Sequence, residues 1–132
     1  MTLRIGFLPS DFNPMILMLG EAEDCRALGG VLRQFARDGR DVALRDLRFC
    51  QPAGVDVVLT AAPGPAGMQA SGSHRFIWRV PPDLAAQFAD RLDDLAAPGR
   101  VAGSEALDCD TVDGIAVNVS CGEYTDDFLR AG

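Results

Sequence analysis

The stretch Leu28-Gly-Gly-Val-Leu-Arg-Gln-Phe-Ala-Arg-Asp-Gly-Arg40 has a counterpart 60 positions later, Phe88-Ala-Asp-Arg-Leu-Asp-Asp-Leu-Ala-Ala-Pro-Gly-Arg100. In both stretches, apolar residues occupy the first, fifth, eighth and ninth positions. This spacing places them on one face and predicts an amphipathic helix in each stretch. Both stretches end in Gly-Arg, and glycine is common just beyond a helix C-terminus. We therefore expect helices over residues 21–38 and 82–97.

The similarity extends over residues 16–59 and 76–119, which align without a gap at the same offset. Seven of the 44 aligned positions are identical, too few to establish a repeat by themselves. A stronger indication is that Gly54 and Gly114 each precede apolar residues at every second position, the period of a β-strand. Helix face, helix end, turn and strand phase thus agree at one offset.

These elements predict an α+β fold made of two βαββ units in tandem. Each unit begins with a strand, at 15–19 or 75–80, and continues with one of the two helices and a strand hairpin. We expect pseudo-twofold symmetry between the units. We also expect an antiparallel-rich sheet with both helices packed on one face.

The whole chain, residues 1–132, is expected to form a single domain, because its length and its 48% of hydrophobic residues suffice for one core. The internal repeats at 15–60 and 75–120 are joined by the segment 61–74, which is rich in Gly, Pro and Ser. We expect this segment to be an irregular, mobile connector. An additional strand at 3–8 precedes the first repeat, and an acidic tail follows the second.

The charge of the chain limits its partners. Nineteen acidic and 12 basic residues give a net charge of −7, which repels nucleic-acid phosphates and anionic lipid. We therefore expect no nucleic-acid and no membrane partner. The N-terminus lacks the features of a signal peptide, and no apolar run approaches the ~18 residues that span a bilayer, so we expect a cytoplasmic location. All the basic residues are Arg, which either the codon composition of a GC-rich bacterial genome or selection for bidentate ion pairing would explain, and we favour the genome.

The cysteines Cys25, Cys50, Cys109 and Cys121 are too far apart for a CxxC metal motif. In a reducing compartment we expect them to be free and to act as small buried hydrophobic side chains. Glycine-rich phosphate-binding motifs are also absent from the sequence. The sequence therefore predicts neither a metal site nor a cofactor.

Two other features suggest chemistry at first sight. His74, the only histidine, lies in the connector with no identifiable residue to orient it, so we do not expect a catalytic base there. The acidic stretch 108–114 lacks the glycine and the final Glu of a calcium loop, and its Asp-Gly pair is typical of a hairpin turn. Catalytic residues are therefore not assigned.

Gly29 and Gly30 lie inside the first predicted helix. Each costs about 1 kcal/mol relative to alanine at such a position. We expect close packing against the sheet or another helix to offset this cost.

The first strands of the two repeats differ on one face. Met15, Leu17 and Leu19 of the first repeat correspond to an arginine, an isoleucine and an arginine of the second. The alternate positions are apolar in both repeats, so we assign them to the core under the helices. Met15, Leu17 and Leu19 would then form an exposed apolar patch, typical of an interface, unless the N-terminal strand or the connector covers them.

The leading hypothesis is a non-catalytic, homodimeric protein-interaction module that uses this apolar patch or the acidic tail. The tail contains Glu123, Tyr124, Asp126 and Asp127, which suit a basic protein partner. The interpretation that we favour for the same segment is a short terminal helix capped by Thr125, which is compatible with a binding role.

The alternative is a small-molecule binder or an enzyme with a site in the groove between the two repeats. Arg75, Arg79, Trp78 and Glu123 would line that groove. Two arginines near an indole suit a carboxylate or phosphate on an aromatic ligand. A duplication with a purely structural role is a third possibility.

Overall fold

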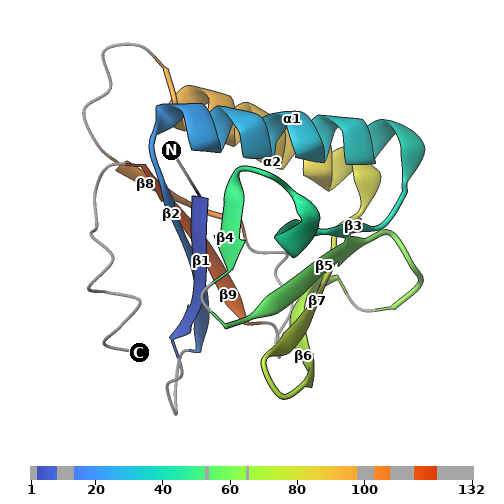
Figure 1. Cartoon of the computed structure of the whole chain (residues 1–132). Helices are drawn as coiled ribbons and strands as arrows, with labels where there is room; N and C mark the ends of the chain where they lie inside the picture. The colour runs from blue at the N-terminus through green and yellow to red at the C-terminus, as the bar shows by residue number, and fades with distance from the viewer. Residues whose placement is uncertain are drawn as a thin grey trace.

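A computed structural model describes residues 3–8, 14–52, 54–64, 66–97, 103–107 and 115–121. Its helical layer consists of α1 (Ala22–Asp38) and α2 (Pro82–Leu95), which lie side by side across one side of the molecule (Figure 1). Neither helix is long and apolar enough to cross a membrane. Both agree with the predicted helices to within two residues.

The ends of the helices follow from local sequence. Before α1, the Glu21 backbone N–H donates to the Asp24 carboxylate at 2.9 Å, half of a reciprocal capping box. After α1, Gly39 adopts φ +64°, and its N–H donates to the Phe35 carbonyl at 2.8 Å. Helix α2 begins at Pro82. The N–H groups of the first helical turn have no acceptor within the helix, so proline, which lacks an N–H, loses no hydrogen bond there. The glycine stop predicted for the first helix is confirmed.

The strands form two sheets. Sheet A has the order β4-β1-β2-β9-β8, and sheet B has the order β3-β5-β7-β6. The bounds in sheet A are β1 (Leu3–Leu8), β2 (Met15–Gly20), β4 (Cys50–Pro52), β8 (Gly103–Ala106) and β9 (Ala116–Cys121). The bounds in sheet B are β3 (Val42–Ala43), β5 (Asp56–Thr60), β6 (Gly67–Gly72) and β7 (Arg75–Arg79), and a short 3₁₀ helix η1 (Leu44–Asp46) follows β3.

The sequence left open whether the two halves share one sheet, and the structure has two mixed sheets. Among the described strands, four pairings are antiparallel and three are parallel, so antiparallel pairing predominates only slightly. β2 pairs in parallel with β9, and β5 pairs in parallel with β7. Each of these pairs joins strands from different predicted repeats, a long-range choice that residue periodicity does not encode. The expected irregular connector is wrong in part, because it contains β6, which pairs antiparallel with β7. The hairpin turn expected at 108–114 lies outside the described residues.

The core lies between the helices and the inner faces of the sheets. Ile16 and Met18 of β2 and Phe76 and Trp78 of β7 are all at most 4% exposed, as the shared apolar phase predicts. The Trp78 ring is stacked on Phe88 of α2, with centroids 6.3 Å apart. Since side chains alternate along a strand, the neighbouring residues of β2 and β7 point to the outer faces.

Among the described residues, a ring contact and a backbone hydrogen bond join the sheets to each other. The Phe7 ring of β1 lies 5.0 Å from the Phe76 ring of β7, centroid to centroid. The Ile115 N–H, just before β9, donates to the Met68 carbonyl of β6 at 2.8 Å. Sheet B is therefore held against sheet A at one end as well as by the helices above.

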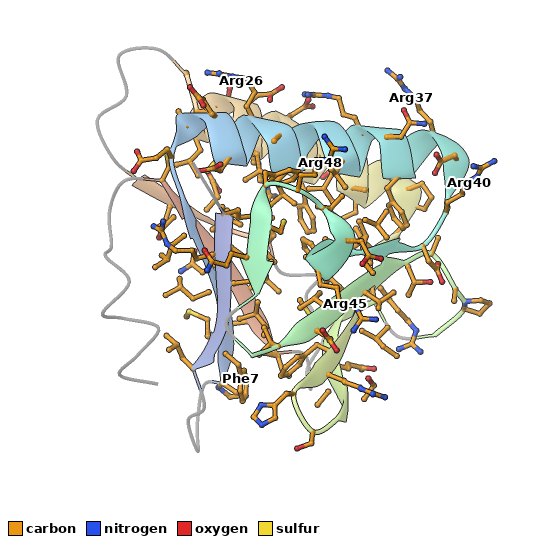
Figure 2. All side chains as sticks on the ribbon, viewed as in Figure 1. Phe7, Arg26, Arg37, Arg40, Arg45 and Arg48 are labelled. Carbon is orange, nitrogen blue, oxygen red and sulfur yellow. The ribbon has the colours of Figure 1, made fainter. Side chains whose placement is uncertain are left out.

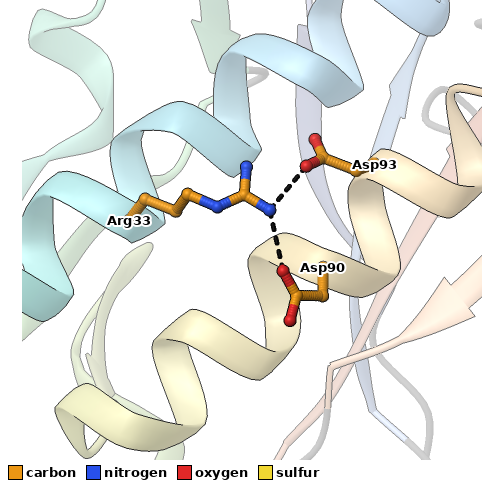
Figure 3. A network of polar contacts seen from close by, with 3 residues as sticks. All are labelled: Arg33, Asp90 and Asp93. Atoms are coloured by element: carbon orange, nitrogen blue, oxygen red, sulfur yellow. Dashed lines mark hydrogen bonds and ion pairs between the residues drawn. The ribbon is translucent and has the colours of Figure 1, made fainter.

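The two helices approach each other at Gly29. A Cβ at this position would lie 3.5 Å from the Ala89 carbonyl oxygen and 3.6 Å from Leu92 Cβ of α2. On the exposed side of the contact, Arg33 Nη2 reaches Asp90 at 2.8 Å and Asp93 at 2.5 Å (Figure 3). Such exposed ion pairs contribute little to stability, so apolar packing holds the helices together. The contact with another helix expected at Gly29 is confirmed as ordinary van der Waals contact, and the same expectation is wrong for Gly30.

Gly30 differs from Gly29, because a Cβ there would meet nothing within 4 Å. We predict that Gly30→Ala raises the free energy of unfolding by about 0.5–1 kcal/mol, the helix-propensity gain. Gly29→Leu should lower it by about 1–3 kcal/mol, because the larger side chain forces α2 away. Urea denaturation followed by Trp78 fluorescence measures both. Gly30→Leu is the matched control, and an equal loss in it would contradict the helix contact.

Candidate functional site

The outer face of sheet B carries a cavity of about 530 Å³. Val57 and Leu59 of β5 point into the core, and so do the alternate residues of β7. The intervening residues of the two strands therefore point outward and line the cavity. We call this cavity the outer pocket.

Three cross-strand rows make up the outer pocket. Its middle row is apolar, because Ala43 lies opposite Val58 and Val58 lies opposite Ile77. All three are half-buried. Polar rows flank this apolar floor on both sides, one at Arg75 and one at Arg79.

The row at Arg75 is basic. Arg75 lies opposite Asp56 in the parallel pairing, and Asp56 is 3.2 Å from Arg45 Nη1 of η1. Figure 2 shows Arg45 beside β5, whereas Arg37 points outward from the far side of α1. Among the described residues, Arg75 is exposed and its guanidinium has no ion-pair or hydrogen-bond partner. Two arginines against one aspartate leave this end with one positive charge.

The row at Arg79 is electrically balanced. Thr60 lies opposite Arg79, and its hydroxyl donates to the Asp41 carboxylate at 2.6 Å. Arg79 Nη1 donates to Gln69 Oε1 at 3.2 Å. Gly64 packs against the Arg79 guanidinium so closely that a Cβ there would lie 2.6 Å from Nε. Arg79 is thus held in position, and its charge is balanced by that of Asp41.

A smaller cavity of about 260 Å³ adjoins this end. It shares Thr60, Ala62 and Arg79 with the outer pocket and extends to Pro81 and Pro82 before α2. The two cavities are therefore neighbours that share the wall formed by these shared residues.

The structure brings together two of the four residues predicted for a ligand groove. Arg75 and Arg79 both line the outer pocket. Trp78 does not, since its side chain is fully buried on the opposite face of β7, and its placement in the groove is a correction to the sequence analysis. Glu123 lies outside the described residues, as do Tyr124, Asp126 and Asp127 of the acidic tail.

The apolar patch predicted on β2 is not exposed as expected. Leu17 and Leu19 are 2% and 1% exposed, and Met15 is half-buried. Strand alternation correctly predicted that Leu17 and Leu19 lie on the opposite face of β2 from Ile16 and Met18. It could not show that their side chains are buried on that face. Exposure of Leu17 and Leu19 was therefore a wrong expectation, and dimerisation through this strand stays a prediction.

The sequence analysis missed Asp41, Arg45, Asp56 and Thr60 of the outer pocket. Asp56 and Thr60 share the strand phase of Val58, which the predicted periodicity already separated from the core. Knowing that β5 pairs with β7 would have placed them beside the arginines. No sequence signal pointed to Asp41 or Arg45, which reach the pocket through the turn after α1 and through η1.

The outer pocket offers hydrogen bonds and charge rather than an evident nucleophile. Thr60 is only 5% exposed, and its oxygen also accepts the Ala62 N–H at 3.1 Å. The two hydrogen bonds of the Thr60 hydroxyl, to Asp41 and from Ala62, hold the backbone in position at the end of β5. His74 sits in the exposed β6–β7 turn at φ +60°. No cluster of His, Cys, Asp and Glu in the described part of the chain could hold a metal ion.

Comparison with known proteins adds nothing to this description: no family model, curated protein or solved structure matches the chain significantly. The site is therefore interpreted from its own geometry.

The described cysteines, Cys25, Cys50 and Cys121, are free and buried, as predicted. Burial, with a smaller contribution from the neighbouring Cys121 thiol, raises the pKa of Cys25 to about 12. Burial, followed by the charge of Asp24, raises the pKa of Cys50 to about 12. Both thiols are thus neutral and unreactive in the folded protein.

We predict that stability falls as the pH rises from about 9 toward 12, because the unfolded chain ionises these thiols at a lower pH than the folded chain. The loss should reach about 1–2 kcal/mol per thiol near pH 10. Urea midpoints at about pH 8 and pH 10 measure it. Cys25→Ala should show a smaller difference between the two pH values, and an unchanged difference would contradict the assignment.

Proposed function

We propose that the protein binds a small anionic ligand with an apolar portion in the outer pocket. The observation that carries this proposal is Arg75, an exposed guanidinium without a partner in the described structure, at the edge of the apolar floor of Val58 and Ile77. A guanidinium binds a carboxylate or phosphate through paired hydrogen bonds. The volume of the pocket falls within the range typical of small-molecule sites.

The charge distribution supports an anion at this end. The chain as a whole carries −7, yet Arg75 and Arg45 outnumber the single aspartate beside them. The Arg45 and Asp56 side chains are 59% and 38% exposed, so their ion pair is weak and is easily exchanged for a ligand. A bound anion would therefore meet a second arginine at little cost.

The same observations favour a binding role over the interaction module. The module relied on an exposed apolar face or on the acidic tail. The burial of Leu17 and Leu19 removes the first support, and the tail lies outside the described residues. The outer pocket lies across strands of both predicted repeats, since β5 belongs to the first and β7 to the second, which supports the alternative of a ligand site between the repeats.

We also propose that the chain arose by duplication of a βαββ unit. The pairing of Asp56 with Arg75 and that of Ala116 with Met15 are equivalent under the 60-residue offset, which supports this origin. In such a duplication, the arginines of β7 replaced Met15 and Leu19 of β2. The outer face of sheet B would then have become a polar site while that of sheet A stayed apolar.

We predict that octanoate, a carboxylate with an apolar chain, shifts the amide resonances of β5 and β7 when titrated into ¹⁵N-labelled protein. Arg75→Gln should weaken binding about tenfold, the loss of one charge-assisted hydrogen bond at a partly exposed site. Octanol, which lacks the charge, should bind more weakly than octanoate.

Arg37→Gln is the matched control, because it removes the same charge from the outward side of α1 (Figure 2). It should bind octanoate as the unaltered protein does. Equal affinity of Arg75→Gln and Arg37→Gln, or resonance shifts confined to sheet A or the helices, would refute the proposal.

A further inference from the structure

We infer that the ligand of the outer pocket is an elongated monoanion, with its charge at the Arg75 end, an apolar middle, and an uncharged hydroxyl or amide group at the Arg79 end. This inference rests on the proposed function and specifies its ligand class. It depends on the difference between the two polar rows of the pocket.

The length of the ligand follows from the strand. Arg75 and Arg79 are four residues apart on β7, which corresponds to about 13 Å between their backbones. Both side chains lie on the outer face, and only Ile77 lies between them on that face. Beside Ile77, the floor continues through Val58 and Ala43, so the span between the two rows is apolar across three strands. A ligand that contacts both rows therefore needs an apolar spacer.

The Arg75 end selects the charged group. Its guanidinium is exposed and has no partner among the described residues, and Arg45 adds a second cation held only by an exposed ion pair. One excess positive charge is available there. A carboxylate or phosphate neutralises it.

The Arg79 end selects an uncharged group. Arg79 and Asp41 balance each other in charge, and Gln69 and Gly64 hold the Arg79 guanidinium in place. A second carboxylate on the ligand would lie near Asp41, a like charge that opposes it. A hydroxyl or amide group can instead accept from the arginine and donate to the aspartate without adding charge.

The experiment compares ligands of one chain length: octanoate, ω-hydroxyoctanoate, the dicarboxylate suberate and octanediol. Affinities come from amide-shift titrations of the full chain. We expect ω-hydroxyoctanoate to bind most tightly, suberate to bind at least threefold more weakly, and octanediol to bind most weakly. Suberate binding as tightly as ω-hydroxyoctanoate would overturn the ligand class and leave the proposed function standing.

Asp41→Asn supplies a second test. The amide oxygen can still accept the Thr60 hydroxyl, but the Arg79 end gains one positive charge. Suberate should then bind at least as tightly as ω-hydroxyoctanoate. Glu23→Gln is the matched control, since it removes the same charge from the exposed first turn of α1. An unchanged ligand order in Asp41→Asn overturns the inference, and failure of octanoate and all the other compounds to bind overturns the proposed function with it.

Discussion

The in-register parallel pairing of β5 with β7 is the constraint on which the rest of the structure depends. It places Asp56, Val58 and Thr60 beside Arg75, Ile77 and Arg79, residue for residue. Because side chains alternate, the same pairing sends Val57, Leu59, Phe76 and Trp78 to the helices. A shift of one residue would bury arginines and expose the only tryptophan, so burial of the inner face fixes the register. The core and the outer pocket thus lie on opposite faces of the same hydrogen-bonded strand pair.

Local elements of this fold were predictable from sequence, and strand partners were not. The strand at 3–8, both helices and the Gly39 stop follow from periodicity and capping, which are local properties. The choice of β9 as the partner of β2 depends instead on packing of segments about 100 residues apart. β6 was missed because its glycines and serine are typical of loops, although at a sheet edge it needs only one neighbour, β7.

The site was predictable only to the extent that it lies on a recognised strand. Arg75 and Arg79 stood out because they replace apolar residues of an otherwise similar segment. Trp78 was misplaced because nearness in sequence was taken for nearness on one face, whereas a residue between two outward side chains points inward. Asp41 and Arg45 come from the segment between α1 and β4, and nothing in their local sequence distinguishes them from other exposed charges. These two residues belong to the site only because the segment after α1 folds back beside β5, which depends on tertiary packing.

The alternation of side chains along the five residues of β7 also places residues that matter for stability on one face and residues that line the outer pocket on the other. Phe76 and Trp78 are at most 4% exposed, and their rings contact Phe7 of β1 and Phe88 of α2 respectively, so changes there act on the core. Arg75, Ile77 and Arg79 lie outside the hydrophobic core cluster and line the outer pocket, so changes there act on the pocket and leave the packing of the helices intact. A strand covered by helices on both faces would have no such freedom, because every position would be constrained by packing. Because neither α1 nor α2 covers the outer face of sheet B, this small fold can carry a polar site next to its core.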